Sequence, residues 1–303
     1  MPSIITFRQG TAADSYDAFC IFEETLADLL RRLGNTEPTS WANPDELAQM
    51  WQKRRPMYEH LAQTADQFWI AEQDGRPIGF VRSVLRDGVR QLTELFVKPG
   101  VQSAGAGREF ISRTFPAEGA RRKSIIATAD TRAQNLYIKL GVYPRFPVYY
   151  FGCTPKATFV ETDLIIEPVT ASPETLETLG TIDRTIIEYR RDVDHAWLLS
   201  QRQGYLYYRD GQPVGYGYVG INSGPFALLN AADFPAVLAH AENEAAGQGR
   251  DHFGVEVPTI NLTAVNYLLS RGFWLDAFVA VMMTDQPFGK FENYICTSPP
   301  FFM

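Results

Sequence analysis

A glycine-containing turn in the first half of the chain has the residue types that bind an anion. Residues 102–108 read Gln-Ser-Ala-Gly-Ala-Gly-Arg and lead into a predicted helix over 105–115. Glycines allow the backbone to turn sharply and approach a ligand, so that successive N–H groups can point at one anion. The start of a helix adds unpaired N–H donors and about half a positive charge. The turn is therefore predicted to bind a diphosphate.

Two well-known phosphate loops do not fit this turn. A Walker loop needs Gly-Lys-Ser/Thr, whereas Gly107 is followed by Arg108 and Glu109. A dinucleotide fingerprint needs a third small residue, where Phe110 stands, and a later acidic residue, where the basic run 121–123 stands. Both are excluded.

A second motif follows the turn. Ala133, Leu136, Tyr137 and Leu140 have the i, i+3, i+4, i+7 spacing of one apolar helix face. This spacing predicts a helix over 133–140. On the spacing alone, these residues could simply form a core face.

The elements that must position these motifs alternate in type. Apolar periodicity and turn residues, with a hairpin at Asp74-Gly75, define the expected elements. Strands are expected at 4–8, 67–73, 77–85, 89–97, 124–129 and 149–153, and helices at 16–33, 43–65 (with a break at Pro56), 105–115 and 133–140. An antiparallel hairpin followed by alternating strand and helix predicts an α/β fold, an α+β mixed sheet flanked by helices.

An internal repeat predicts two domains. The stretch Asp74-Gly-Arg-Pro-Ile-Gly returns as Asp210-Gly-Gln-Pro-Val-Gly, 136 residues later. Residues 133–142 (AQNLYIKLGV) return as 264–273 (AVNYLLSRGF), 131 residues later. Two matches in the same order and at nearly equal offsets indicate a duplicated domain. We predict domains 1–154 and 155–303, called the first and the second repeat below.

The two motifs together resemble those of a known superfamily. The run Val97-x-Pro99-x-x-Gln102-x-x-Gly105-x-Gly107 resembles the acetyl-CoA loop of the GNAT superfamily of N-acetyltransferases. Residues 133–141 resemble the second cofactor motif of that superfamily. The order, element types and spacing agree over residues 1–150. The second repeat resembles the same fold only in outline, so the chain resembles a tandem GNAT protein with a degenerate second domain.

The resemblance implies a cofactor site in the first repeat. The backbone amide of Phe96 or Val97 would bond the thioester oxygen of acetyl-CoA and stabilise the charge that develops there. Asp130 stands where the superfamily usually has Asn, and Ala133 begins the second motif. The implied pyrophosphate-binding residues are Gln102, Ser103, Ala104, Gly105, Ala106, Gly107 and Arg108.

The resemblance also implies a mechanism. In this superfamily the amine attacks the thioester directly, and Tyr137 stands where a tyrosine protonates the leaving thiolate. A phenol, with a pKa of about 10, stays protonated at neutral pH and can donate a proton. Glu94, on the strand face of Leu92 and Phe96, is our candidate for the base that deprotonates the amine. Glu94 could instead be an edge carboxylate or the partner of a nearby arginine, and a water chain could replace it.

The second repeat lacks these motifs. Residues 229–235 contain no glycine pair, and Leu268 stands where the first repeat has Tyr137. We therefore expect one active site per chain. Trp41, Trp51 and Tyr58 either line the acceptor pocket or pack between helices, and the apolar tail 294–303 docks at a domain interface or in a homodimer contact.

Charge and composition narrow the partners. Residues 98–145 hold nine basic against three acidic residues, which suits a phosphate-rich ligand, whereas residues 156–303 hold nine against 18. The first repeat is nearly neutral and has no basic–aromatic stripe, so no nucleic acid is expected. The chain has no signal-peptide pattern or membrane-length apolar run, and its three cysteines and four histidines lack metal-ligand spacing. A cytoplasmic protein without a metal is expected.

The predicted function is an acetyl-CoA-dependent N-acetyltransferase that acts on an amine of a small molecule or peptide through a ternary complex. The alternative is a non-catalytic protein that binds acyl-CoA or only a partner. A third hypothesis is an acyltransferase that prefers a longer acyl group.

Overall fold

The computed structural model describes residues 4–34, 39–101, 105–116 and 118–300. The chain divides into two compact units, Met1–Lys123 and Ser124–Met303. This division by packing falls earlier than the predicted domain boundary at 154, which stays a prediction. Each unit is described by itself.

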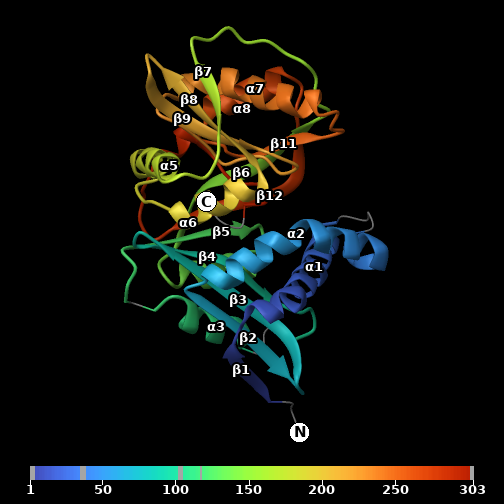
Figure 1. Ribbon diagram of the computed structural model, residues 1–303. Helices are drawn as coiled ribbons and strands as arrows, with labels where there is room; N and C mark the ends of the chain where they lie inside the picture. The colour runs from blue at the N-terminus through green and yellow to red at the C-terminus, as the bar shows by residue number, and fades with distance from the viewer. Residues whose placement is uncertain (1–3, 35–38, 102–104, 117, 301–303) are drawn as a thin grey trace. The chain divides into compact units, whose positions relative to one another are not determined.

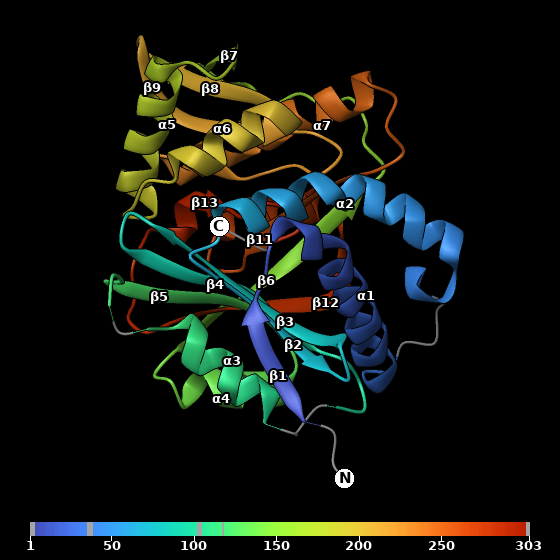
Figure 2. The same ribbon diagram turned by 60° about the horizontal axis from the view of Figure 1, so that its bottom comes forward.

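The first unit contains an antiparallel sheet with strand order β1-β2-β3-β4. Helices α1 and α3 lie against opposite faces of this sheet, as Figures 1 and 2 show. The elements are β1 (Ile5–Gln9), α1 (Ser15–Arg32), α2 (Pro44–Thr64), β2 (Gln67–Gln73), β3 (Arg76–Arg86), β4 (Val89–Val97) and α3 (Ala106–Thr114), with short 3-10 turns η1 (Ala12–Asp14) and η2 (Ser40–Ala42).

Helix α2 corrects one sequence prediction. Asn43 caps the helix start as predicted, because its side chain accepts hydrogen bonds from the N–H groups of Asp45 and Glu46. The predicted break at Pro56 is wrong, because α2 continues through it to Thr64. Proline removes one helical hydrogen bond, but the fully buried Tyr58 and Leu61 pack the following turn against the rest of the unit.

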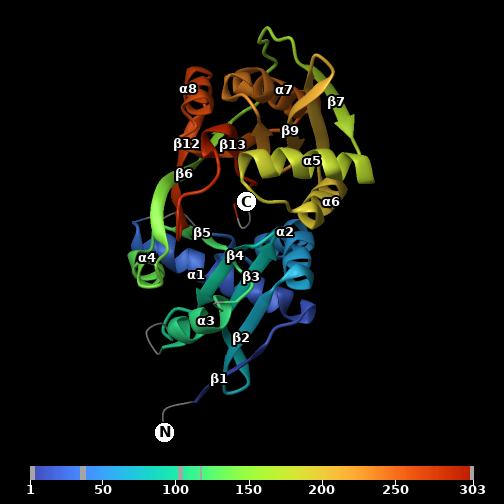
Figure 3. The ribbon, with the colours of Figure 1, turned by 90° about the vertical axis from the view of Figure 1, so that its left-hand side faces the viewer.

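The second unit holds a four-strand antiparallel arrangement with order β5-β12-β6-β11. Strands β5 and β6 come from the first repeat, whereas β11 and β12 come from the second. Each repeat therefore places one strand, β6 or β12, beside strands of the other repeat, and Figure 3 shows β6 (green) next to β12 (red). The bounds are β5 (Arg122–Thr128), α4 (Thr131–Ile138), β6 (Tyr143–Cys153), β11 (Phe253–Pro258) and β12 (Trp274–Thr284).

A second sheet of this unit has strand order β13-β10-β9-β8-β7, with every described pairing antiparallel. Its strands are β7 (Ile165–Val169), β8 (Gln203–Arg209), β9 (Gln212–Val219), β10 (Phe226–Leu228) and β13 (Tyr294–Ile295). The helices are α5 (Pro173–Ile186), α6 (Asp192–Gln201), α7 (Phe234–Gly247) and α8 (Leu262–Ser270), with 3-10 turns η3 (Ala231–Asp233) and η4 (Phe291–Asn293). The predicted α/β class, with mostly antiparallel sheets flanked by helices, is confirmed.

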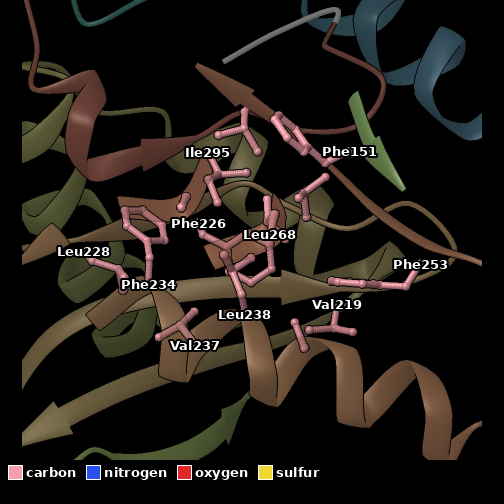
Figure 4. Close-up of a cluster of buried hydrophobic side chains, with 14 of the residues drawn as sticks. Phe151, Val219, Phe226, Leu228, Phe234, Val237, Leu238, Phe253, Leu268 and Ile295 are labelled. Carbon is pink, nitrogen blue, oxygen red and sulfur yellow. The ribbon is translucent and has the colours of Figure 1, made fainter. Parts of the chain in front are cut away.

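The core of the second unit mixes side chains from both repeats. Phe151 and Cys153 on β6 belong to the first repeat. They pack in one buried cluster with second-repeat residues that include Phe253, Leu268 and Ile295, and Figure 4 shows Phe151 among them. Burial of these apolar groups holds β6 in the second unit.

The segment between the repeats is fastened to helix α7. The N–H of Lys156 donates to the carboxylate of Glu242 at 3.1 Å. The side chain of Asn243 accepts from the N–H of Thr158 at 2.8 Å and donates to its carbonyl at 2.9 Å. Residues 156–158, called the strap below, are thus fixed to α7 by hydrogen bonds.

The C-terminal tail docks within the second unit as far as Ser298. Cys296 and Thr297 are buried. The backbone of Cys296 forms an isolated antiparallel β-bridge with Glu256 of β11. The guanidinium of Arg202 donates to Thr297 Oγ1 at 3.0 Å and to the carbonyl of Ser298 at 2.8 Å. Residues 301–303 lie outside the described residues. The described part of the tail therefore completes a sheet of its own unit.

None of the helices in the described part of the chain has both the length and the hydropathy needed to cross a bilayer.

Candidate functional site

Residues 105–108 of the predicted diphosphate loop have the expected backbone conformation. Gly105 is the N-cap of α3 and has φ +92°, in the left-handed region that favours glycine. The N–H groups of Ala106, Gly107 and Arg108 occupy the first helical turn, where they have no acceptor within the helix. A Cβ atom at Gly105 would meet no atom within 4 Å, so the loop is open on that side. Gln102, Ser103 and Ala104 lie outside the described residues.

Packing fixes the start of α3 against the sheet. Ala106 and Phe110 are buried, whereas Arg108 is exposed. The Phe110 ring makes an edge-to-face contact with Phe7, with centroids 5.4 Å apart. A Cβ at Gly79 of β3 would lie 3.1 Å from this ring and 2.9 Å from the carbonyl oxygen of Phe96. Gly79 therefore lets α3 and the end of β4 approach the same point of β3.

The end of β4 carries the predicted thioester contacts. Phe96 is half-buried, and its ring lies 5.0 Å from Phe22 of α1. Val97 is buried and pairs with Gly79, and the N–H of Lys98 donates to the carbonyl of Ile78 at 2.8 Å. Strand β4 is therefore held as far as Lys98. A contact between the thioester and a backbone amide of Phe96 or Val97 stays a prediction.

Glu94, the candidate base, lies in a buried ion pair. Its two carboxylate oxygens accept from Nε and Nη2 of Arg82 at 2.6 and 2.7 Å. Both side chains are 0% exposed. Nη1 of the same guanidinium donates to the carbonyl of Tyr58 at 2.8 Å. A carboxylate occupied by a bidentate arginine is poorly placed to accept a proton from an amine, so the structure favours the alternative, Glu94 as the partner of an arginine.

Aromatic rings enclose this ion pair. The Arg82 guanidinium lies 4.8 Å from the ring of Tyr58, 5.1 Å from Phe68 and 5.4 Å from Phe80. Burial raises the pKa of Tyr58 well above its usual range, and the nearby charge of Glu94 adds to this. The Arg82–Glu94 ion pair and its bond to Tyr58 therefore connect β3, β4 and α2 inside the first unit.

The aromatic residues of the N-terminal segment pack against one another. Trp51 lies 5.3 Å from both Tyr16 and Phe19 and 6.1 Å from Tyr58, centroid to centroid. This arrangement favours helix packing over an acceptor pocket for Trp51 and Tyr58. Trp41 lies in η2 and is half-buried.

In the second unit, Asp130 caps helix α4. Its carboxylate accepts from the N–H of Arg132 at 2.9 Å and pairs with the Arg132 guanidinium at 2.7 Å. Gln134 donates to the carbonyl of Thr128 at 2.9 Å, which fixes the helix to the end of β5. Ala133 is half-buried in the first turn. The arginine partly offsets the negative charge of Asp130.

Tyr137, the predicted acid, lies about one turn after Ala133 in α4. Its side chain is 5% exposed. Burial raises the pKa of the phenol above its usual range, and the charge of Asp130 acts in the same direction. The phenol is therefore neutral at physiological pH and keeps the proton that a general acid must donate.

The corresponding positions of the second repeat serve packing and capping. Leu268 is fully buried in the hydrophobic cluster. The side chain of Asn261 accepts from the N–H of Ala264 at 3.1 Å and donates to the carbonyl of Tyr294 at 3.2 Å. Asp233, at the start of α7, pairs with Arg209 at 2.8 Å. A single active site per chain stays a prediction.

Sequence reasoning missed a buried polar network in the second repeat. Asp183 of α5 lies 2.8 Å from Arg191 Nε and 2.8 Å from His195 Nε2, and Tyr216 Oη hydrogen bonds to the same carboxylate. The other ring nitrogen of His195 lies 2.7 Å from Tyr218 Oη. No motif joins these residues in sequence. The only sequence signal for this network is the large number of tyrosines in β8 and β9.

Comparison with known proteins identifies the family of this region. Residues 64–143 match the family model of the acetyltransferase (GNAT) domain. No curated protein sequence matches the chain.

Solved structures resemble the whole chain. A protein from Pyrococcus horikoshii, provisionally named an acetyltransferase, has a TM-score of 0.69 at 17% identity, over 96% of this chain and 92% of that one. A glucosamine N-acetyltransferase region of a fungal multi-domain β-N-acetylglucosaminidase has a TM-score of 0.61 at 13% identity, over 93% of this chain and 38% of that one. A tandem GNAT protein from the clavulanic acid biosynthesis pathway has a TM-score of 0.51 at 14% identity, over 94% and 99%.

These comparisons confirm the predicted resemblance to a tandem GNAT protein, whereas the degenerate second domain stays a prediction. Residues 64–143 match a GNAT acetyltransferase domain, and the fold of the chain is shared with a tandem GNAT protein over nearly its full length. At these identities the structural likeness shows the fold alone.

Proposed function

We propose that this protein is an acetyl-CoA-dependent N-acetyltransferase that acetylates a primary amine of a small molecule or peptide. One observation carries the proposal. Within the segment that matches an acetyltransferase domain, a left-handed Gly105 opens helix α3, whose first N–H groups have no acceptor within the helix, beside open space. This is the backbone arrangement that a pyrophosphate needs. The basic balance of residues 98–145 supports the same ligand.

The proposed reaction is a direct transfer in a ternary complex. The amine nitrogen forms a bond to the acetyl carbon while the C–S bond breaks, and the sulfur takes the bonding electron pair. Tyr137 donates its proton to the leaving thiolate and regains one from solvent. An amide of Phe96 or Val97 stabilises the negative charge that develops on the thioester oxygen.

The proton lost by the amine needs a different route from the one predicted. Both oxygens of Glu94 accept hydrogen bonds from Arg82. We therefore propose that water carries this proton away, and that Glu94 only holds strand β4 in position. Water was the alternative that the sequence left open.

The acceptor is proposed only as a class. A neighbour in fold is named as a glucosamine N-acetyltransferase region, so glucosamine belongs in the first set of amines tested. The acidic second half of the chain would favour a cationic acceptor by electrostatic steering. A cytoplasmic location and a homodimer remain part of the proposal.

The test combines binding with chemistry. Purified protein should bind coenzyme A and acetyl-CoA in calorimetry, and should release free thiol from acetyl-CoA when glucosamine, a lysine peptide or an alkyl diamine is added. Binding without thiol release across the amines would favour the non-catalytic acyl-CoA-binding protein. Stronger competition by longer acyl-CoA esters would favour the longer-chain acyltransferase. No binding at all would reject the proposal.

A further inference from the structure

The two repeats exchange strands β6 and β12 within the second unit. Strand β12 of the second repeat pairs with β5 of the first in five consecutive positions, from Ala280 opposite Thr128 to Thr284 opposite Ser124. Strand β6 of the first repeat pairs with β11 of the second in six positions, from Cys153 opposite Phe253 to Val148 opposite Pro258. The exchange is therefore reciprocal.

Side chains reinforce the exchanged strands. Arg145 of β6 donates to the hydroxyl of Thr284 in β12 at 2.7 Å and to its carbonyl at 3.1 Å. Phe151 and Cys153 of β6 are buried in the core of the second repeat. Beyond β6, the chain is fastened to α7 through Glu242 and Asn243. Strand β6 cannot leave its place without opening the sheet and the buried cluster, and β12 cannot leave without breaking its ladders with β5 and β6.

Because of the exchange, the second repeat helps to position predicted catalytic residues of the first repeat. Strand β5 leads directly into α4, which carries Asp130, Ala133 and Tyr137. The ladder with β12 fixes β5 up to Thr128, and Gln134 then bonds the carbonyl of that residue. The position of Tyr137 thus depends on a strand that lies about 150 residues later in the chain.

We infer that the second repeat is retained as a structural partner that holds the β5–α4 segment of the first repeat in place. The two repeats form one inseparable pair, although the sequence reads as two successive domains. The role of Tyr137 in this inference rests on the proposed function, whereas the strand exchange does not.

A nick between the repeats tests the inference on the full chain. Residues 161–163 are exposed and lie between the strap and β7, so a specific protease site can be inserted after Glu161. After cleavage the two fragments should elute together at the mass of the intact chain and separate only in denaturant. Nicked protein should also release thiol at the rate of the uncut protein. Fragments that separate in native buffer would overturn the inference.

A cross-link tests the register of the exchange. Ala127 and Val281 are opposite each other in the β5–β12 ladder, at a Cα separation that a disulfide can bridge. The double variant Ala127→Cys/Val281→Cys, oxidised with copper phenanthroline and then nicked, should give one band on a non-reducing gel. The matched control Ala127→Cys/Met283→Cys, shifted by two positions, should give two bands. Two bands from the first variant, or one from the control, would contradict the register.

The two proposals can fail separately. Fragments that stay together in a protein without acetyl transfer would remove the proposed function and leave the structural partnership intact. An active intact chain whose nicked fragments separate would do the reverse.

Discussion

At the scale of single residues, two carboxylates show how neighbours decide a role. Glu94 lies on the strand face expected of a base, yet Arg82 occupies both of its oxygens. Asp130 is a departure from the family pattern, yet it caps α4 and pairs with Arg132. The sequence could place both residues on their elements. It could not show the Arg82 pair, because Arg82 stands on another strand, 12 positions away.

A negative charge at position 105 is predicted to weaken the binding of coenzyme A. Asn and Asp tolerate the left-handed conformation better than other side chains, so Gly105→Asn and Gly105→Asp differ mainly in charge. We expect Gly105→Asp to lower the affinity for coenzyme A by at least about 100-fold, through repulsion of the pyrophosphate. Gly105→Asn should retain most of the affinity. Calorimetry compares the two, and equal affinities would refute the loop assignment.

Tyr137 is predicted to act on turnover rather than on binding. Tyr137→Phe keeps the buried ring and removes only the hydroxyl, so the fold should stay intact. We expect kcat to fall by roughly 100-fold while the Kd for coenzyme A stays unchanged. The exposed Tyr143→Phe is the matched control and should retain full turnover. Full activity of Tyr137→Phe would exclude the phenol as the acid.

At the scale of elements, the Arg82–Glu94 pair joins β3 to β4 and is expected to govern stability. Removing one member of a fully buried pair leaves an uncompensated charge, which costs about 3–5 kcal/mol. Glu94→Gln should therefore lower the free energy of unfolding by this order in urea titrations.

Two further variants define this effect. The double variant Arg82→Met/Glu94→Leu should recover most of the loss, because no buried charge remains. Glu109→Gln, which breaks the surface pair with Arg113, should cost less than about 1 kcal/mol. A Glu94→Gln protein of unchanged stability would show that the pair is not essential to the strands.

Helices α5 and α6 meet at Asp183, which is predicted to make the second unit sensitive to acid. Burial alone would raise the pKa of Asp183, but Arg191 and His195 outweigh it and lower this pKa to about 2. An unfolded aspartate has a pKa of about 3.9. The stabilisation is therefore complete above pH 4 and is lost as the pH falls from about 4 to 2, by roughly 2 kcal/mol.

Thermal unfolding across this range checks the prediction. Asp183→Asn should abolish the loss between pH 4 and 2 and lower stability at neutral pH, because Arg191 is left without its carboxylate. Asp192→Asn, at a half-buried pair with Arg190 outside the Asp183 network, should behave like the unchanged protein. A wild-type curve that is flat from pH 4 to 2 would contradict the assignment.

Local elements were the part of the fold that the sequence could predict. Strands β2 and β4 have the predicted bounds, and α1 and α3 differ by a residue at each end. Short-range signals, such as apolar periodicity and the Asp74-Gly75 turn, set these limits. Helix α2 passed the predicted break at Pro56 because tertiary packing outweighs one lost hydrogen bond.

At the scale of the whole molecule, the repeat predicted the tandem architecture but not the strand exchange. Strands β6 and β12 are equivalent in the two repeats, and both are apolar enough for either sheet. Their partners are chosen by contacts more than 100 residues apart in sequence, which local patterns do not encode. The buried network around Asp183 was missed for the same reason, since its members come from α5, α6 and β9.

The fastening of the tail by Arg202 has a consequence for trimming from the carboxyl end. Burial lowers the pKa of this guanidinium to about 10, and Thr297 and Ser298 supply two of its acceptors. Digestion by a carboxypeptidase should therefore stall at Ser298, because further digestion would remove two hydrogen-bond acceptors of a buried cation. Mass spectrometry of the digest should show a final product that still contains Ser298.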